Sequence, residues 1–509
     1  MRLNHLKIRK TWLVALLSTG VLVGLFFFFR MYAVMYSGPW GIHIMRQSDS
    51  LSFASQYYNH GYHFFEPQLF NLKNADGKAA CEFPLLYYIT ALLYLVFGKN
   101  FLILKLLNLS VLYFGIFNIF RLACGILKDY FYAALIALFL FTSTVFNYYS
   151  FNYLPDSAAL GLVFSGWYYI FRYLSGRRKK ALVAGFVFFT MGSLIKITYL
   201  INPLSIMVLA AFSLIKKNKG YIPAEKCRKI IWYGIAGILP VAIWTGYVLW
   251  YNHINHSTSF NTTILPIWNM SHSSISNVWD HMRHYWHSNY FYQSSFHLLF
   301  VFIVLQIIML RKSDLRLIML LCILLLGSAA YWMLFYSQFQ DHDYYFLAFF
   351  PFVLFLLLSV IRTMQKVSSR LFLHVALKIV IAVIIVAGIN YSRMKLSQRY
   401  NAKPDQYSIT SFRIQQNKRE IDKLNIPADA KILVAPDPCQ NGGLFFLNRM
   451  GWTLDSLSDV TADTIQFYKN KGADYVLLAT SDSACLSAGS ASGEQVLIGK
   501  DIGVFQLKK

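Results

Sequence analysis

The chain has 509 residues, of which 56% are hydrophobic and only 14% are charged, and its net charge at pH 7 is +24. A soluble protein usually has about 25% charged residues, and recurrent apolar stretches of span length indicate a polytopic α-helical membrane protein instead. The positive charge lies in short loops between these stretches, as in cytoplasmic loops, and this distribution excludes a soluble basic domain that binds nucleic acid.

The first apolar stretch predicts a retained transmembrane anchor. It runs from Trp12 to about Met35 after a basic N-terminus, is too long for the apolar core of a signal peptide, and is followed by no small-residue cleavage site. We therefore expect the N-terminus in the cytoplasm. The spans expected along the chain are residues 12–35, 101–120, 130–149, 157–174, 181–197, 199–215, 230–250, 295–310, 316–336, 343–361 and 372–391.

The first polar loop, residues 36–100, carries the strongest catalytic signal. It contains Arg46-Gln47-Ser48-Asp49 near its start and Glu82-Phe83-Pro84 near its end. A carboxylate just outside the first span could act as a base on a lipid-borne substrate, and charges beside a membrane core are functional candidates. The apolar segment 84–98 is short, so we expect a juxtamembrane or re-entrant helix rather than a full crossing.

Basic clusters in alternate loops favour a single orientation of the chain. They lie at residues 121–128, 177–180, 216–229, 311–316 and 362–370. All of them are cytoplasmic in one orientation if segment 84–98 does not cross. In that orientation the loops 36–100 and 251–294 face outward, together with Asp156, Lys196 and the segment 341–345.

These outward-facing groups suit a transferase that takes a sugar from a polyprenyl phosphate. Such an enzyme needs a carboxylate to accept the proton of the attacking hydroxyl, cations to stabilise the departing phosphate, and an apolar groove for the lipid. Asp49 could supply the base. Arg46, Lys196 and His342 could contact the phosphate. The sequence has no glycine-rich nucleotide-binding motif, so no water-soluble donor is implied.

At these residues the chain resembles the GT-C fold integral membrane glycosyltransferases, in the branch of the protein O-mannosyltransferases and the lipid A aminoarabinose transferase (families 39 and 83). The resemblance spans about residues 12–395 and is carried by Arg46-Gln47-Ser48-Asp49, the stretch 82–88, Pro155-Asp156, and 342–345 with Pro351. It implies about 11–13 transmembrane helices, a polyprenyl-phosphate-linked donor, transfer outside the membrane, and Asp49 as the base. The expected substrate-binding residues are Arg46, Glu82, Asp156, Lys196, His342 and Tyr345.

The chain also departs from this family's pattern. Some relatives have a lysine before the helix-starting proline, where this chain has Phe83, so phosphate contacts must come from elsewhere. The extra sugar-binding domains of eukaryotic O-mannosyltransferases are absent, which favours a bacterial protein in an inner membrane. No cofactor is certain, although Glu82 and Asp156 could bind a divalent metal. The acceptor could be a lipid, a glycan or a protein.

Other interpretations stay open from sequence alone. The chain could be a transporter or flippase of a lipid-linked glycan, or a noncatalytic scaffold in envelope assembly. A transporter would place polar groups near the middle of the membrane, whereas these lie at one face. Among the individual residues, Asp49 could cap a helix beginning near Leu51, Lys196 could extend to the headgroups, and His342 and Asp343 could be a solvated loop.

Residues 396–509 predict a small α/β domain outside the membrane. Charge rises there and long apolar runs disappear. Strands are expected at 431–437, 473–479 and 503–507, and helices at 405–424, 444–450 and 461–471. The turn-rich loop 436–443 follows the first of these strands, at an edge where open α/β sheets often bind ligands; a purely structural turn is the favoured interpretation.

Overall fold

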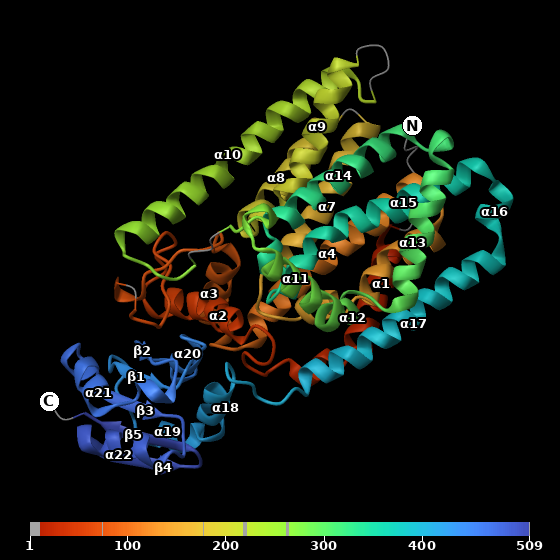
Figure 1. Ribbon diagram of the computed structural model, residues 1–509. Helices are drawn as coiled ribbons and strands as arrows, with labels where there is room; N and C mark the ends of the chain where they lie inside the picture. Colours follow the sequence, from red (N-terminus) through yellow and green to blue (C-terminus); the bar gives the residue numbers. More distant parts are fainter. Residues whose placement is uncertain (1–10, 74, 177, 217–220, 261–263, 508–509) are drawn as a thin grey trace. The chain divides into compact units, whose positions relative to one another are not determined.

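The computed structural model describes residues 11–73, 75–176, 178–216, 221–260 and 264–507 (Figure 1). The chain divides into two compact units. Unit 1 comprises Met1–Val34, Lys105–Thr245 and Thr262–Gln398, and unit 2 comprises Met35–Leu104, Gly246–Asn261 and Arg399–Lys509.

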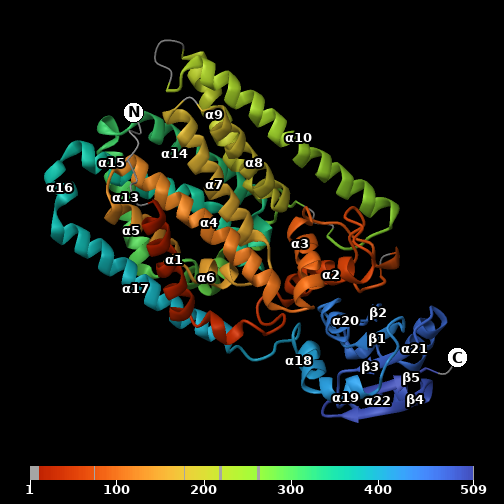
Figure 2. The same ribbon diagram turned by 180° about the vertical axis from the view of Figure 1, so that it is seen from behind.

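Unit 1 is built from long apolar helices that run alongside one another (Figure 2). Its main helices are α1 (Thr11–Phe28), α4 (Leu102–Leu127), α5 (Tyr130–Phe139), α6 (Thr144–Ser150), α7 (Asp156–Ser175), α8 (Lys179–Ile195), α9 (Ile201–Ile215), α10 (Ala224–Ile254), α13 (Gln293–Ile308), α14 (Leu315–Leu334), α15 (Phe350–Val367) and α17 (Val375–Tyr400). Shorter elements connect them, including α11 (His272–His281), α12 (His287–Tyr290), α16 (Ser369–Leu373) and the 3-10 helices η3 (Leu140–Thr142), η4 (Ile197–Leu200) and η9 (Asp343–Phe349).

Helices occupy every segment predicted to span the membrane. By length and apolar composition, six helices in the described part of the chain could cross a membrane, or up to eight if each bent pair is one span. The segment predicted as a span at 130–149 is not one straight helix, because α5 with η3 and α6 are bent by 85°. The break lies at Ser143, whose hydroxyl accepts a hydrogen bond from the Phe146 N–H and caps α6.

The helices α4 and α7 approach so closely that their backbones touch. A Cβ atom on Gly115 would lie 2.3 Å from the carbonyl oxygen of Gly161, and one on Gly161 would lie 2.5 Å from that of Val111. Small residues are what permits such contacts between membrane helices. The pair therefore fixes the start of α7, where Asp156 is located.

Gly161→Ala is expected to destabilise unit 1, because the added methyl group must push α4 and α7 apart. Overpacking of this kind costs about 1–3 kcal/mol, which a thermal melt in detergent would register as a lower midpoint. Gly20→Ala in α1 is the matched control, since no atom lies within 4 Å of the added Cβ. Equal melting points for the two variants would contradict the close helix contact.

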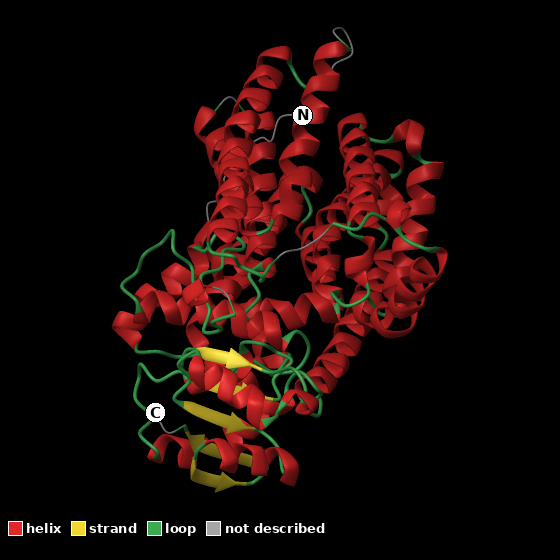
Figure 3. Cartoon of the chain, turned by 60° about the vertical axis from the view of Figure 1, so that its left-hand side comes forward, coloured by secondary structure: helices red, strands yellow, loops and turns green. Residues whose placement is uncertain are grey.

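Unit 2 contains two short helices, α2 (Ile44–Asn59) and α3 (Leu85–Phe97), and the C-terminal sheet (Figure 3). At 13 residues, α3 is about 20 Å long, shorter than the roughly 30 Å hydrocarbon core. The sheet has the order β2-β1-β3-β5-β4, in which β1 is parallel to β2 and β3, and β5 is antiparallel to β3 and β4. The strands are β1 (Ile432–Ala435), β2 (Gly451–Thr453), β3 (Tyr475–Leu478), β4 (Glu494–Gly499) and β5 (Ile502–Gln506).

Helices pack on this sheet and complete the C-terminal part. They are α18 (Ile409–Gln416), α19 (Lys418–Lys423), α20 (Gly442–Leu447), α21 (Ala462–Asn470) and α22 (Ser483–Ser492). The three strands predicted from the sequence are confirmed, while β2, β4 and α22 were missed. The predicted helix 405–424 is two helices that meet at Asn417, and the helix predicted at 444–450 ends at Leu447 because Asn448 adopts a left-handed conformation.

The first polar loop joins the edge of this sheet. The Leu72 N–H donates to the Gly451 carbonyl oxygen at 2.7 Å, and the Gly451 N–H donates to the Phe70 carbonyl oxygen at 3.0 Å. Residues 70–72 thereby extend the sheet beyond β2. The structure thus groups residues 35–104 with the C-terminal residues, whereas the sequence predicts that this loop belongs to a transmembrane part, 1–395, separate from residues 396–509.

Candidate functional site

The carboxylate of Asp49 lies on α2, five residues from the helix start at Ile44. It is therefore not a cap of a helix beginning near Leu51, and that structural interpretation is wrong. Its side chain is only 8% exposed. A buried carboxylate needs compensating polar partners, and two segments of unit 2 supply them.

Arg46 and Glu82 form an ion pair beside Asp49. The Arg46 Nη2 atom donates to both carboxylate oxygens of Glu82, at 3.0 and 2.9 Å, and Nη1 lies 3.6 Å from Asp49 Oδ2. Glu82 also accepts hydrogen bonds from the Tyr87 hydroxyl and the Cys81 thiol. Because these groups engage its carboxylate, Glu82 holds Arg46 in place one helical turn from Asp49.

The C-terminal loop 436–443 supplies the second partner. The side-chain amide of Asn441 donates to Asp49 Oδ1 at 3.2 Å and to the Ser52 hydroxyl at 2.7 Å. The sequence of this loop favours a structural turn, and no sequence signal marks Asn441 as a functional residue. Only its position at the C-terminal end of a parallel strand hinted at a role.

A hollow of about 630 Å³, open solvent included, adjoins Asp49. The Phe260 ring lies on its wall with the Arg46 guanidinium 5.0 Å from the ring centroid. The hollow is lined by Met45, Arg46, Asp49, Leu69, Asn71, Lys73, Thr258, Ser259, Phe260, Cys439, Gln440 and Asn441. Hydroxyls, amides, cations and an aromatic face are the groups that bind a polyhydroxylated ligand.

Burial raises the pKa of Asp49 from its usual acidic value to about 7. The Arg46 guanidinium opposes this effect, the nearby Glu82 carboxylate adds to it, and the Asn441 amide lowers the pKa by donating to the charged form. A carboxyl group with a pKa near neutrality takes up a proton far more readily than an ordinary aspartate. The site can therefore perform general-base chemistry at Asp49.

A second cluster of predicted residues lies in unit 1. The Lys196 Nζ atom is 2.9 Å from Asp156 Oδ1, with the two side chains 19% and 6% exposed. The ammonium group also lies over the rings of Tyr344 and Tyr345, at 4.8 and 5.0 Å from their centroids. Lys196 lies between the helices α8 and η4 and has an extended backbone, with φ −145°. Its side chain therefore does not follow the direction of either helix's side chains.

His342 completes the second cluster. Its ring stacks on Tyr344 with a centroid separation of 5.4 Å and contacts Tyr345 at 5.7 Å. Asp343 is fully buried and accepts a hydrogen bond from the Tyr149 hydroxyl at 2.6 Å. The segment is therefore packed, and the interpretation of Asp343 as part of a solvated loop is wrong.

The seven predicted site residues thus gather in two clusters. Arg46, Asp49 and Glu82 belong to unit 2, and the other four belong to unit 1. Among the described residues, no group of three or more histidines, cysteines or acids is placed to hold a metal ion. Glu82 and Asp156 are engaged by Arg46 and Lys196.

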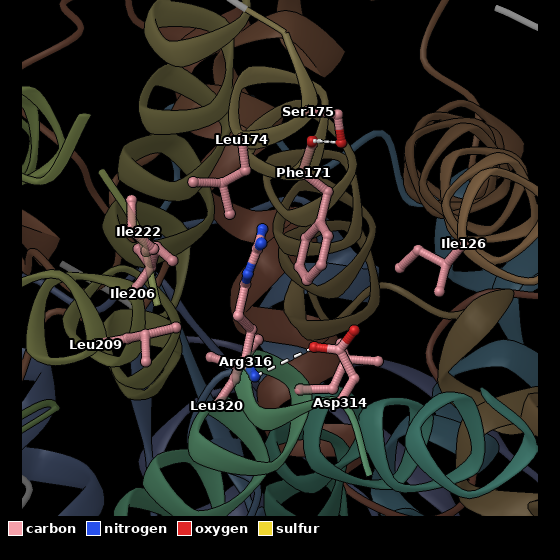
Figure 4. A pocket seen from close by; sticks show the side chains of 11 residues that line it. Ile126, Phe171, Leu174, Ser175, Ile206, Leu209, Ile222, Asp314, Arg316 and Leu320 are labelled. Atoms are coloured by element: carbon pink, nitrogen blue, oxygen red, sulfur yellow. Dashed lines mark hydrogen bonds between the residues drawn. The ribbon is translucent and has the colours of Figure 1, made fainter. Parts of the chain in front are cut away.

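Unit 1 also has an apolar hollow of about 580 Å³, open solvent included, between α7, α9 and α14 (Figure 4). Figure 4 shows the Arg316 side chain extending into it beside Leu174 and Phe171. Asp314, on the same wall, accepts a hydrogen bond from the Arg316 N–H at 3.2 Å and pairs with Lys366 at 3.6 Å. These contacts cap α14 and its loop, and they give Asp314 a structural role.

Solved structures resemble the whole chain in fold. ArnT from Cupriavidus metallidurans bound to undecaprenyl phosphate superposes with a TM-score of 0.61 at 11% identity, over 96% of this chain and 97% of that one. An Archaeoglobus fulgidus oligosaccharyltransferase in complex with Zn and sulfate gives 0.53 at 11% identity, over 90% and 68%. The arabinofuranosyltransferase AftD from Mycobacteria gives 0.51 at 11%, over 97% and 40%.

The chain is an integral membrane protein with the GT-C fold, because these neighbours are GT-C glycosyltransferases and its apolar helices could cross a membrane. No family profile and no curated protein sequence matches it. The fold predicted from the sequence motifs, a polytopic helical membrane part with a small C-terminal α/β part, is confirmed.

Proposed function

We propose that this protein is a membrane glycosyltransferase that moves a sugar from a polyprenyl-phosphate-linked donor to an acceptor hydroxyl, with Asp49 as the general base. One observation carries the proposal. A buried carboxylate, with its pKa raised to about 7, lies beside a fixed arginine at the wall of a polar hollow. The fold shared with ArnT bound to undecaprenyl phosphate supports the choice of donor.

In the proposed reaction, the acceptor oxygen attacks the anomeric carbon and its proton passes to Asp49. A new carbon–oxygen bond forms as the bond between sugar and phosphate breaks, and the polyprenyl phosphate leaves with the electron pair. Arg46 stabilises negative charge beside Asp49, and Glu82 keeps the guanidinium in place. Without a covalent intermediate, a single displacement of this kind inverts the anomeric configuration.

The cluster around Lys196 is proposed to bind the donor phosphate. Lys196 supplies a cation held by Asp156, and His342 and Tyr345 add donors and aromatic surface beside it. A phosphate is a suitable ligand for a lysine whose position is already fixed, because little side-chain entropy is lost on binding.

The proposed location is a bacterial inner membrane, with the N-terminus in the cytoplasm and the C-terminal α/β part on the extracytoplasmic side. The alternation of basic loops supports this orientation. The acceptor would then be a lipid, glycan or protein of the envelope. The test is a transfer assay with purified protein, a panel of radiolabelled polyprenyl-phosphate sugars and an envelope extract; label on an acceptor is expected, and its absence with every donor would contradict the proposal.

The transfer rate at saturating donor is expected to rise with pH through about 7. Asp49 accepts a proton only as the carboxylate, and burial raises its pKa, so the active form is lost as pH falls through that value. The rate should be followed from about pH 5 to about pH 9. A rate that stays constant down to about pH 4, the ordinary range of an aspartate, would be incompatible with Asp49 as the base.

A further inference from the structure

The side chain of Asn441 does not make the helix-capping hydrogen bond that its position before α20 predicts. Asn441 is the N-cap residue of α20, where an asparagine usually accepts a hydrogen bond from the helix N-terminus. Here its side chain makes no capping bond. The carboxylate of Asp437 accepts the Gly443 N–H at 2.7 Å instead. Asp437 therefore caps the helix, and the Asn441 amide is available for another contact.

The amide of Asn441 is fully engaged and held in one orientation. Its oxygen accepts the Phe70 N–H at 3.1 Å, and its nitrogen donates to Asp49 and to Ser52. The side chain is only 2% exposed. Rotating the amide would place its oxygen against the Asp49 carboxylate, and that repulsion fixes the N–H group toward the carboxylate.

We infer that Asn441 is a positioning residue through which the C-terminal α/β part orients Asp49 and holds it in the ionised state. This inference deepens the proposed function and rests on it. The C-terminal sheet then contributes directly to the reaction, because Asn441, in the loop after β1, contacts the base Asp49. Gly443 lets the Asp437 carboxylate reach the start of α20, because a Cβ on Gly443 would lie 2.8 Å from Asp437 Oδ2.

The charged and titratable groups that face Asp49 come from three segments. Arg46 lies on the same helix, Glu82 precedes α3, and the Cys439 thiol belongs to the C-terminal loop. Lys73 lines the same hollow. Removal of the Asn441 amide leaves these groups in place and removes one donor to the carboxylate, so the pKa of Asp49 should rise further.

The test compares Asn441→Ala with two control variants in the full-length protein. Ser52→Ala removes the other acceptor of the amide, and Asn470→Ala removes an exposed asparagine of α21. The first measurement is an infrared titration of the protonated carboxyl band, assigned to Asp49 by its loss in Asp49→Asn. The second is the pH profile of transfer.

For Asn441→Ala, the carboxyl titration and the rising limb of the rate should both move up by about one pH unit. Transfer at the wild-type midpoint should fall about fivefold, and the two controls should keep the wild-type midpoint. An unshifted titration in a folded Asn441→Ala protein would overturn the inference, and so would an equal shift in Ser52→Ala. Because the infrared titration needs no turnover, it decides the inference even if the proposed transferase activity is absent.

Discussion

Asp49→Asn is expected to lower sugar transfer by about 10²–10⁴-fold while donor binding persists. The amide has nearly the shape of the carboxylate but cannot accept the proton of the attacking hydroxyl. Because the native carboxyl is buried and has its pKa raised to about 7, replacing it with a neutral group should not lower the melting temperature. Transfer would be measured with radiolabelled donor, and donor binding by equilibrium filtration.

The matched control for this variant is Asp76→Asn in the same loop. Asp76 is exposed and adopts a positive φ of 49°, which asparagine tolerates, so its transfer rate should equal that of the wild type. If Asp49→Asn transferred sugar at the wild-type rate, Asp49 would not be the base. If it lost donor binding in parallel with transfer, Asp49 would be a ligand of the donor.

Lys196→Met is expected to have the second large effect, on both stability and donor binding. It leaves Asp156 buried without its cationic partner, and breaking a buried ion pair in this way costs about 3–5 kcal/mol. The variant should melt at a lower temperature than the wild type. It should also lose affinity for polyprenyl phosphate, measured by quenching of intrinsic fluorescence on lipid addition.

A double variant separates these two effects of Lys196. Asp156→Asn with Lys196→Met removes both charges, so most of the lost stability should return. The phosphate affinity should stay low, because no cation has been restored. If the double variant regained wild-type lipid affinity, Lys196 would have a structural role only. If the single variant melted like the wild type, the ion pair would contribute nothing to the fold.

The positions of the long helices can be predicted from the sequence, because the length of an apolar segment is read directly from consecutive residues. Helices make up most of each predicted span, and the motif around Arg46 and Asp49 contains a buried carboxylate with an arginine beside it. The bend at Ser143 was not foreseen, because the residues around it are as apolar as a continuous span. A single serine that caps the following helix gives too weak a signal.

The contacts between distant segments were outside the reach of sequence reasoning. Asn441 is 392 positions from Asp49 along the chain, and no periodicity connects the two. The strand β2 has three residues and β4 carries exposed polar ones, so neither shows the alternation that marks a half-buried strand. The pairing of Phe70 and Leu72 with Gly451 uses backbone groups, which any sequence could supply.

The sequence indicates which charged residues are candidates for a functional site, but it does not indicate which neighbours pair with them. Glu82 is predicted to contact substrate, and the structure shows that its carboxylate also accepts hydrogen bonds from Arg46, Tyr87 and Cys81. Charge and position along the chain indicate that a residue is a candidate for a functional site. Which neighbour neutralises it depends on how the chain folds back, and only the structure gives that.

The most direct test of the account is a proteoliposome experiment that separates sugar transfer from lipid transport. Protein would be reconstituted with a polyprenyl-phosphate donor that is labelled in the sugar, together with acceptor. The account predicts that each sugar gained by the acceptor releases one polyprenyl phosphate, and that Asp49→Asn abolishes both. Labelled donor that crosses the bilayer with its sugar–phosphate bond intact, equally fast in wild type and Asp49→Asn, would contradict it and identify a transporter.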